Sequence, residues 1–369
     1  MASEFAVARA VVIAATLALC VGTSAYAGDT MGSWNELVAA AQREGKVVVM
    51  GPAHPEVRRA LPAAFKARFG VDMEYLGGPA SAAAIKLRAE RSAGLYTADI
   101  TLAGVQSMAT IFHREGLLEP IRPVLLPEVL DGSKWKKGEP WFMDPEGQYV
   151  LRLFSSQSEQ FSVNTRVVKD ADMRTARDLL LNPKFKGKIA THDPTVPGTG
   201  SNQMARFYAA FGEDFAKQLY VDQKPMMSRD ERQLTDWLLR GTYPIVLGVD
   251  DAQIDEMGKE GMPVKAVFTL PDLPGIVAVG NGLVGMFKNA PHPNAAKLFV
   301  NWIASKDGLE TYARAVKWSP TRNDIDEASF VPPQSIPKAG AEYFDLSDWN
   351  FTVTAKETAR LRMKEMLGR

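Results

Sequence analysis

The sequence has one cysteine, Cys20, which lies within the first 27 residues. The rest of the chain contains no thiol, so disulfides and cysteine-ligated metals are excluded there. Neither sign of charge is in excess, because 43 basic residues balance 43 acidic ones. Nothing therefore indicates a surface for nucleic acid or for an anionic membrane. After residue 27 no apolar run has the length of a transmembrane helix, so we expect the remaining chain to be soluble.

Residues 1–27 have the pattern of an export signal. Arg9 precedes an apolar run over residues 10–21, and a small-residue end, Ala25-Tyr26-Ala27, follows it. The run is too short to span a bilayer, which favours a cleaved signal over an anchor. A lipoprotein signal at Cys20 is the alternative, but Leu19 stands before it where a small residue is expected. We predict a periplasmic protein whose signal is cleaved after Ala27.

The residues that follow alternate between helix and strand patterns. A capping box at 33–36 predicts the start of a first helix, and Pro55 with Gly70 predicts the two ends of a second. A third helix is expected after the Gly77-Gly78 turn. Short apolar strands are expected between these helices, over 46–50, 71–76 and 98–102. Such alternation is typical of an α/β fold with a largely parallel sheet and helices on both faces.

A second α/β block occupies roughly residues 188–270, between two extended passages. This organisation predicts two lobes, each with a mostly parallel sheet flanked by helices, joined by two crossing strands. We assign residues 28–155 and 280–369 to lobe 1 and residues 156–279 to lobe 2. The pattern leaves open on which lobe the helices after residue 293 pack.

Several stretches resemble bacterial extracellular solute-binding proteins of ABC transporters. They are ELVAAA (36–41) with EGKVVV (44–49), AER (89–91) with ADI (98–100), NT (164–165), DLL (178–180), GKIA (187–190), DP (193–194) and APHPNAA (290–296). The branch that the chain resembles most contains binders of ferric iron, phosphonates and sugar phosphates. The resemblance implies the type II periplasmic binding protein fold, in which two lobes close on a ligand like a hinged clamp. It also implies a permease in the inner membrane as partner.

The strongest local signal for a ligand site is the stretch DPTVPGTGS, residues 193–201, directly before a predicted helix. Glycines allow close approach of the backbone, and the free N–H groups of a helix start favour an anion. Thr199, Gly200 and Ser201 are therefore predicted ligand contacts. The alternative is a plain strand-to-helix turn with Ser201 as the N-cap.

In the other half of the chain, the stretch GGPAS, residues 77–81, also precedes a predicted helix. Ser81 is the candidate ligand donor there, although a capping role would give the same pattern. His54 follows the first strand at the edge of the sheet where α/β proteins bind ligands. The adjoining Pro55 makes a simple loop role equally plausible for His54.

Ferric iron is the alternative ligand implied by the resemblance, because a histidine occupies the position of His54 in the ferric binders. The other iron ligands do not carry over. The acidic position after strand 98–102 is occupied by the stretch AGVQ (103–106), and Val249-Asp250-Asp251 replaces the expected pair of tyrosines. Since ferric iron prefers anionic oxygens such as phenolates, we predict no metal and no other cofactor.

Three further residues complete the candidate site. Asp250 ends an apolar strand and could accept hydrogen bonds from a ligand amine or hydroxyl, unless it caps the helix that follows. Arg152 and Arg206 are the basic residues nearest the predicted cleft, and a guanidinium can bind a carboxylate or phosphonate with two hydrogen bonds. The alternative for each arginine is a solvated surface position.

We predict that the chain captures a ligand and does not transform it. The expected ligand is a small organic anion, such as a phosphonate, phosphate ester or carboxylate, and it can be zwitterionic. An exported hydrolase is the rival, but neither Gly-x-Ser-x-Gly nor His-Glu-x-x-His is present. A partner that presents its ligand to a membrane sensor would have the same fold and stays open. We expect a monomer that delivers its ligand to the permease and binds no nucleic acid.

Overall fold

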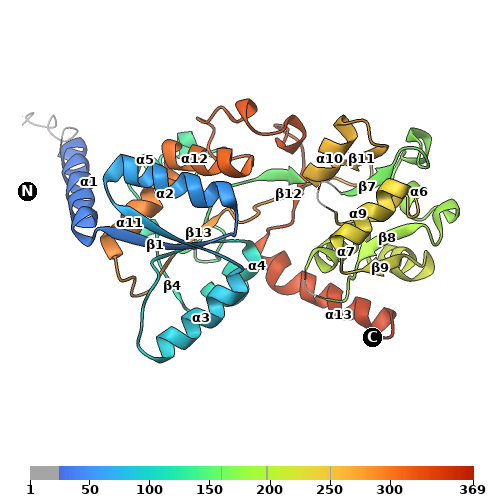
Figure 1. The fold of residues 1–369 in the computed structure, drawn as a ribbon, viewed down its shortest axis with the longest axis horizontal. Helices are drawn as coiled ribbons and strands as arrows, with labels where there is room; N and C mark the ends of the chain where they lie inside the picture. The colour runs from blue at the N-terminus through green and yellow to red at the C-terminus, as the bar shows by residue number, and fades with distance from the viewer. Residues whose placement is uncertain (1–24, 159, 197, 250) are drawn as a thin grey trace, which may run out of the picture.

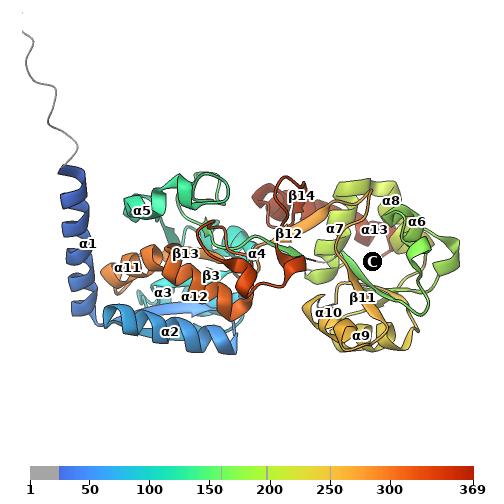
Figure 2. The ribbon, with the colours of Figure 1, turned by 90° about the horizontal axis from the view of Figure 1, so that it is seen from above.

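The computed structural model describes residues 25–158, 160–196, 198–249 and 251–369. Two α/β lobes lie side by side, as Figures 1 and 2 show. We call the body around the six-stranded sheet lobe 1 and the body around the five-stranded sheet lobe 2. A three-stranded sheet lies between them. Residues 1–24 of the predicted signal lie outside the described residues.

The sheet of lobe 1 is mixed. It contains β1 (Lys46–Gly51), β2 (Asp72–Gly77), β3 (Ile100–Ala103), β4 (Leu118–Glu119), β5 (Leu151–Arg152) and β13 (Leu283–Phe287), in the order β2-β1-β3-β13-β4 with β5 also on β13. Strand β1 is parallel to β2 and β3, whereas β13 is antiparallel to β3, β4 and β5. The prediction of a mostly parallel sheet is confirmed, because β1 to β5 run in the same direction. Strand β13 runs against them, since it enters from the opposite end after the chain returns from lobe 2.

The helices of lobe 1 are α1 (Ala25–Glu44), α2 (Pro55–Phe69), α3 (Ala80–Ser92), α4 (Val105–Ser107), α5 (Pro127–Leu130), α11 (Pro293–Ala304) and α12 (Lys306–Val316). Helix α2 agrees with the prediction at both ends. Its start has Pro55 in the first turn, and Gly70 ends it in the left-handed conformation (φ 72°), with an N–H that donates to Lys66. Helix α1 begins at Ala25, so the predicted capping box at 33–36 does not start it.

Lobe 2 repeats this architecture with the same strand order. Its strands are β7 (Phe161–Asn164), β8 (Ile189–His192), β9 (Met226–Ser228), β10 (Ile245–Leu247) and β11 (Val264–Val267), in the order β11-β7-β10-β8-β9. In this order β9, β8, β10, β7 and β11 take the places of β2, β1, β3, β13 and β4. Strands β10, β8 and β9 are parallel, whereas β7 is antiparallel to both of its neighbours. The helices are α6 (Ala176–Leu180), α7 (Thr199–Phe211), α8 (Glu213–Lys217), α9 (Glu231–Arg240), α10 (Asp251–Lys259) and α13 (Lys356–Met366).

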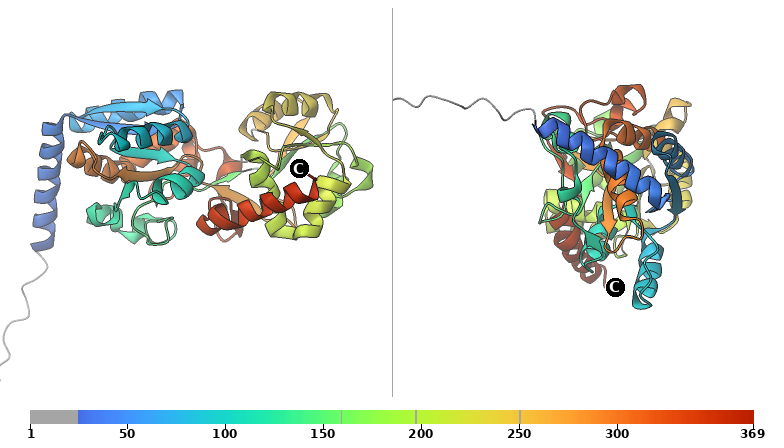
Figure 3. Two further views of the ribbon diagram at one scale, coloured as in Figure 1. Left: turned by 90° about the horizontal axis from the view of Figure 1, so that it is seen from below. Right: turned by 90° about the vertical axis from the view of Figure 1, so that its left-hand side faces the viewer.

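The lobes are connected three times. Strands β6 (Ser156–Ser158) and β12 (Gly275–Ala278) are the two predicted crossings, and they pair with each other and with β14 (Tyr343–Asp345). From β14 the chain crosses a third time. Trp349 packs against an apolar cluster of lobe 1, whereas Phe351 and Met363 belong to the core of lobe 2. The range 280–369 is therefore shared: α11 and α12 pack on lobe 1, and α13 lies along lobe 2 (Figure 3).

Each lobe has its own apolar core. In lobe 1, Phe65 packs against Phe299 and Trp302, with ring centroids 5.7 and 5.2 Å apart. In lobe 2, Phe207 of α7 packs against Phe215 of α8, with ring centroids 5.9 Å apart. Among the described residues, no helix combines the length and the apolar character that crossing a membrane would require.

Candidate functional site

A pocket of about 360 Å³ lies at the carboxyl ends of β1, β2 and β3 in lobe 1. Its walls come from the ends of these strands, from the first turn of α3 and from Arg58 on α2. Two glycines pack closely against side chains there. A Cβ atom on Gly51 would lie 2.4 Å from the Tyr75 hydroxyl, and one on Gly77 would lie 2.7 Å from Nη2 of Arg58. The strand ends are thus shaped around Tyr75 and Arg58.

Two cationic side chains, Arg58 and Lys86, line this pocket. Lys86 is occupied, since its amine forms an ion pair with Glu90 and donates to Thr97 at 3.0 Å. Within the described part of the chain, the guanidinium of Arg58 forms no hydrogen bond or ion pair. Its neighbour Arg59, in contrast, forms an ion pair with Glu56 at 2.5 Å. Arg58 is therefore the free cation of the pocket.

Tyr75 forms the rigid side of the pocket. Its hydroxyl donates a hydrogen bond to the carbonyl oxygen of Pro52 at 2.9 Å. Burial raises the pKa of Tyr75 well above its usual value, and the nearby charge of Arg58 only partly opposes this. Tyr75 is thus a neutral phenol in the physiological range.

His54 lies at the start of the helix that carries Arg58. It occupies the N-cap position of α2, but its side chain makes no capping hydrogen bond. Its Nδ1 atom is buried and has no hydrogen-bond partner among the described residues. One helical turn later, the N–H of Arg58 donates to the carbonyl of His54 at 3.0 Å. His54 is not among the residues that line the pocket, but it lies one helical turn before Arg58 and has an unused polar atom.

Ser81 does not have the predicted position. It is the second residue of α3 and is exposed, and the N-cap residue is Pro79, without a side-chain cap. The pocket is lined by Ala80, Ala82 and Ala83 from the same turn. Because the wall facing the pocket consists of alanines and backbone, the structure assigns the serine hydroxyl neither of its two predicted roles.

Three residues at the start of α7 in lobe 2 were predicted to contact the ligand, and the structure gives them different roles. The hydroxyl of Ser201, which is 1% exposed, accepts from the N–H of Gly198 at 3.1 Å and donates to its carbonyl at 3.0 Å. A Cβ on Gly200 would lie 2.5 Å from the carbonyl oxygen of Asp193, so this glycine lets the helix pack against the end of β8. Ser201 and Gly200 therefore build the loop. The exposed Thr199 is left to contact a ligand.

Polar side chains that the sequence did not single out surround Thr199. A Cβ on Gly248, at the end of β10, would lie within 3.2 Å of atoms of Thr199, Gln203 and His192, so these groups converge there. The Oε1 atom of Gln203 is buried and has no hydrogen-bond partner among the described residues. Burial lowers the pKa of His192, which keeps this imidazole neutral near neutral pH. This edge of lobe 2 thus offers neutral hydrogen-bonding groups.

The two predicted arginines have a structural role. Arg152 is fully buried, donates to the carbonyl of Phe154 at 2.7 Å, pairs with Asp345 of β14 and stacks on Trp141 at 3.9 Å. Arg206 is 1% exposed and bonds to the side chain of Gln160, and burial lowers its pKa to about 9. Both guanidiniums are occupied inside the protein, so the structure corrects their placement at the cleft. Asp250 lies outside the described residues.

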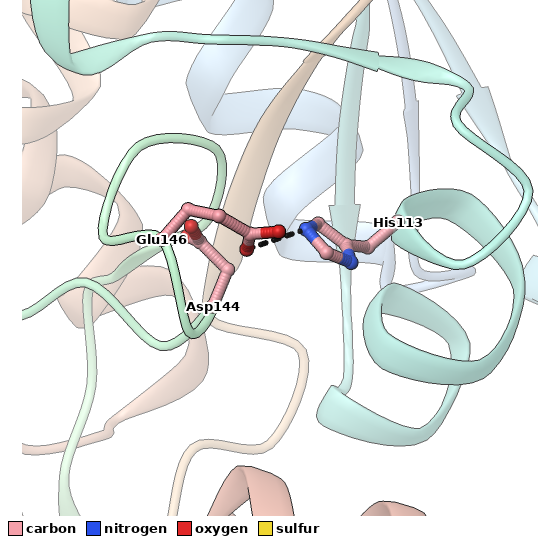
Figure 4. Close-up of side chains that lie close together, drawn as sticks. All are labelled: His113, Asp144 and Glu146. Atoms are coloured by element: carbon pink, nitrogen blue, oxygen red, sulfur yellow. Dashed lines mark hydrogen bonds and ion pairs between the residues drawn. The ribbon is translucent and has the colours of Figure 1, made fainter.

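A group with possible metal ligands lies elsewhere in lobe 1, where His113, Asp144 and Glu146 have ligand atoms within 4.8 Å of one another (Figure 4). The Asp144 carboxylate already accepts three backbone N–H groups, from residues 148, 149 and 150, at 2.7–3.0 Å. Glu146 pairs with His113 at 3.1 Å. This arrangement stabilises the turn at 144–150, and none of its members lines the pocket at the strand ends.

The strand ends of two lobes, each with a helix start and polar side chains, are the arrangement of a protein that holds a solute. A family model for bacterial extracellular solute-binding proteins matches residues 60–339. The chain belongs to this family. It is a bacterial extracellular solute-binding protein. This agrees with the resemblance seen in the sequence.

Individual relatives are distant. An uncharacterised protein of Haemophilus influenzae is 24% identical over 288 residues, which is 73% of this chain and 76% of the relative. Iron-bound HitA from Pseudomonas aeruginosa has a TM-score of 0.63 at 16% identity, over 85% of this chain and 99% of that one. AfuA from Actinobacillus pleuropneumoniae, with fructose 6-phosphate bound, has a TM-score of 0.60 at 20% identity. The match covers 87% of this chain and 97% of that one. These structures confirm the predicted two-lobed fold and leave the ligand undetermined.

Proposed function

We propose that the protein captures a small organic anion between its two lobes and delivers it to the permease of an ABC importer. The ligand class is a phosphonate, a phosphate ester or a carboxylate. The observation that carries the proposal is the free guanidinium of Arg58, in a pocket at the carboxyl ends of three strands. A guanidinium in this position can bind an oxyanion with two parallel hydrogen bonds.

The remaining contacts follow from the geometry of the two strand edges. In lobe 1, Arg58 would bind the anionic group, with His54 beside it. In lobe 2, Thr199 and Gln203 would offer hydrogen bonds to hydroxyl groups of the same ligand. Asp250 stays a candidate for a ligand amine or hydroxyl. We further propose that the protein is a monomer, that its signal is cleaved after Ala27, and that binding involves no covalent chemistry.

Ferric iron is disfavoured by the charges in the pocket. A cation would lie beside the unpaired Arg58. Among the lining residues, the only side chain that could supply an anionic oxygen is Tyr75, whose phenol is neutral. The sensor-partner and hydrolase alternatives share the fold but differ in what they require. A sensor partner would bind a receptor ectodomain, and a hydrolase would release product from the bound anion.

The test compares Arg58→Gln with Arg59→Gln, its neighbour on α2, which forms a surface ion pair with Glu56. Thermal unfolding of the exported chain would be measured with inorganic phosphate, methylphosphonate, fructose 6-phosphate, citrate and ferric citrate. An anion at about 100 times its Kd adds about 2.7 kcal/mol to the free energy of unfolding. Loss of a charge-assisted hydrogen bond costs about 1.5–3 kcal/mol, so Arg58→Gln should weaken binding by about 10- to 100-fold.

The control Arg59→Gln should retain the affinity of the wild type, because exposed ion pairs contribute little. Equal affinity of Arg58→Gln and the wild type for the best anion would contradict the proposed site. A response to ferric ion without any response to the organic anions would contradict the proposed ligand class.

A further inference from the structure

The third crossing between the lobes ends in a helix that is fixed to the candidate loop of lobe 2. Helix α13 packs against α7, and Ala359 and Met363 are buried in the lobe 2 core. Nη1 of Arg360 donates to the carbonyl of Thr195 at 2.9 Å, within the loop that leads to α7. Any displacement of α13 would therefore displace this loop as well.

The first residue of α13 reaches the other lobe. The amine of Lys356 donates a hydrogen bond to Oε1 of Gln106. Gln106 belongs to α4, which follows the end of β3, and Thr101 and Leu102 of β3 line the lobe 1 pocket. The contact therefore joins the start of a lobe 2 helix to the same sheet edge as the candidate site.

The acceptor is held in place by its own element. Nε2 of Gln106 donates to the hydroxyl of Thr110 at 3.2 Å, and that hydroxyl donates to the carbonyl of Gln106 at 2.7 Å. With its amide nitrogen bonded to Thr110, the side chain presents its oxygen to Lys356. The acceptor is thus oriented from lobe 1 alone, before lobe 2 contributes anything.

Lys356 differs from the two arginines of its helix. Arg360 pairs with Glu357, and Arg362 pairs with Glu213 and Glu365. The amine of Lys356 has a neutral amide as its hydrogen-bond partner. Burial lowers its pKa to about 8, so the folded protein keeps this amine in a poorly solvated position. Its hydrogen bond to Gln106 links this amine to lobe 1.

We infer that Lys356 is a positioning residue whose contact with Gln106 sets the separation of the two halves of the candidate site. Through Arg360 and the packing of α13 on α7, the contact fixes the 193–199 loop relative to the end of β3. This role does not depend on the identity of the ligand. It makes the C-terminal segment a third determinant of lobe geometry, beside the crossings at β6 and β12.

The experiment measures the distance between the lobes without ligand. Spin labels on cysteines introduced at Arg43 of α1 and Arg232 of α9, both exposed, report the distance by double electron–electron resonance. The only natural cysteine, Cys20, is replaced by serine. Lys356→Met and, from the opposite lobe, Gln106→Ala should each shift or broaden the distance distribution. Lys356→Arg, which keeps a donor, should restore most of the native distribution.

The matched control is Lys364→Met, two turns further along α13. Its side chain has no hydrogen bond or ion pair among the described residues, so the distance distribution should not change. Thermal unfolding of each variant shows that both lobes remain folded. The inference is overturned if Lys356→Met and Gln106→Ala give the native distribution, or if Lys364→Met changes it as much as they do.

Discussion

The replacement Gly200→Ala tests whether the start of α7 is fixed by contact with β8. In a helix this substitution normally stabilises by about 1 kcal/mol. Here the added Cβ would lie 2.5 Å from the carbonyl oxygen of Asp193 and 2.7 Å from that of His192. These are backbone atoms, which cannot rotate away, so the helix start must move. Overpacking costs about 1–3 kcal/mol, and a clash with two backbone oxygens belongs in the upper half of that range. After the helix gain is subtracted, we expect the free energy of unfolding to fall by about 1–2 kcal/mol.

Urea unfolding followed by circular dichroism would measure this loss as a lower midpoint with an unchanged slope. The control is Gly78→Ala, where a Cβ would meet no atom within 4 Å, and its midpoint should stay close to that of the wild type. A Gly200→Ala protein as stable as the wild type would refute the argument. It would mean that the helix start adapts freely, and that Gly200 is not needed to position Thr199.

Three further results are expected. Gly77→Ala should weaken anion binding with little effect on unfolding by urea, because the added Cβ would displace the flexible end of Arg58. If calorimetry gave the variant the same anion affinity as the wild type, this expectation would be contradicted. Arg152→Met should lower the free energy of unfolding by about 3 kcal/mol, because it leaves Asp345 without its buried partner, and a loss below 1 kcal/mol would show that the pair contributes little. The pKa of Lys356 in the folded protein, about 8, lies below its usual 10.5, so the unfolded state binds the extra proton between these values. The stability of the wild type relative to Lys356→Met should therefore rise between pH 8 and 10.5, and a flat difference would contradict the shift.

Most of the architecture follows from local patterns in the sequence. Helix α2 could be predicted at both ends because proline and glycine act within one turn of the chain. The direction of β13 could not be predicted in this way. A strand's orientation depends on where the chain re-enters lobe 1 after its long passage through lobe 2. The third crossing was missed for a similar reason. The side chains that anchor it, Trp349 and Phe351, are only two residues apart and pack on different lobes.

The candidate site was predicted by region more successfully than by residue. The sequence located two helix starts after strand ends, and the structure has a pocket at one and converging polar groups at the other. It did not indicate which hydroxyl would be used for capping, since Ser81 and Ser201 stand in similar contexts. The buried roles of Arg152 and Arg206 depend on partners distant in sequence, Asp345 for the first and Gln160 for the second.

Arg58 shows what a closer reading of the sequence could have found. Arg58 and Arg59 are adjacent, and successive residues on a helix point about 100° apart. Glu56 lies three residues before Arg59, the spacing at which helical ion pairs form, so Arg59 has a local partner. Arg58 has no acid at that spacing, and it lies in the first turn of the helix that follows β1. An arginine without a local acid, in the first turn of a helix that follows a parallel strand, is therefore a pattern from which Arg58 could have been proposed as an anion contact.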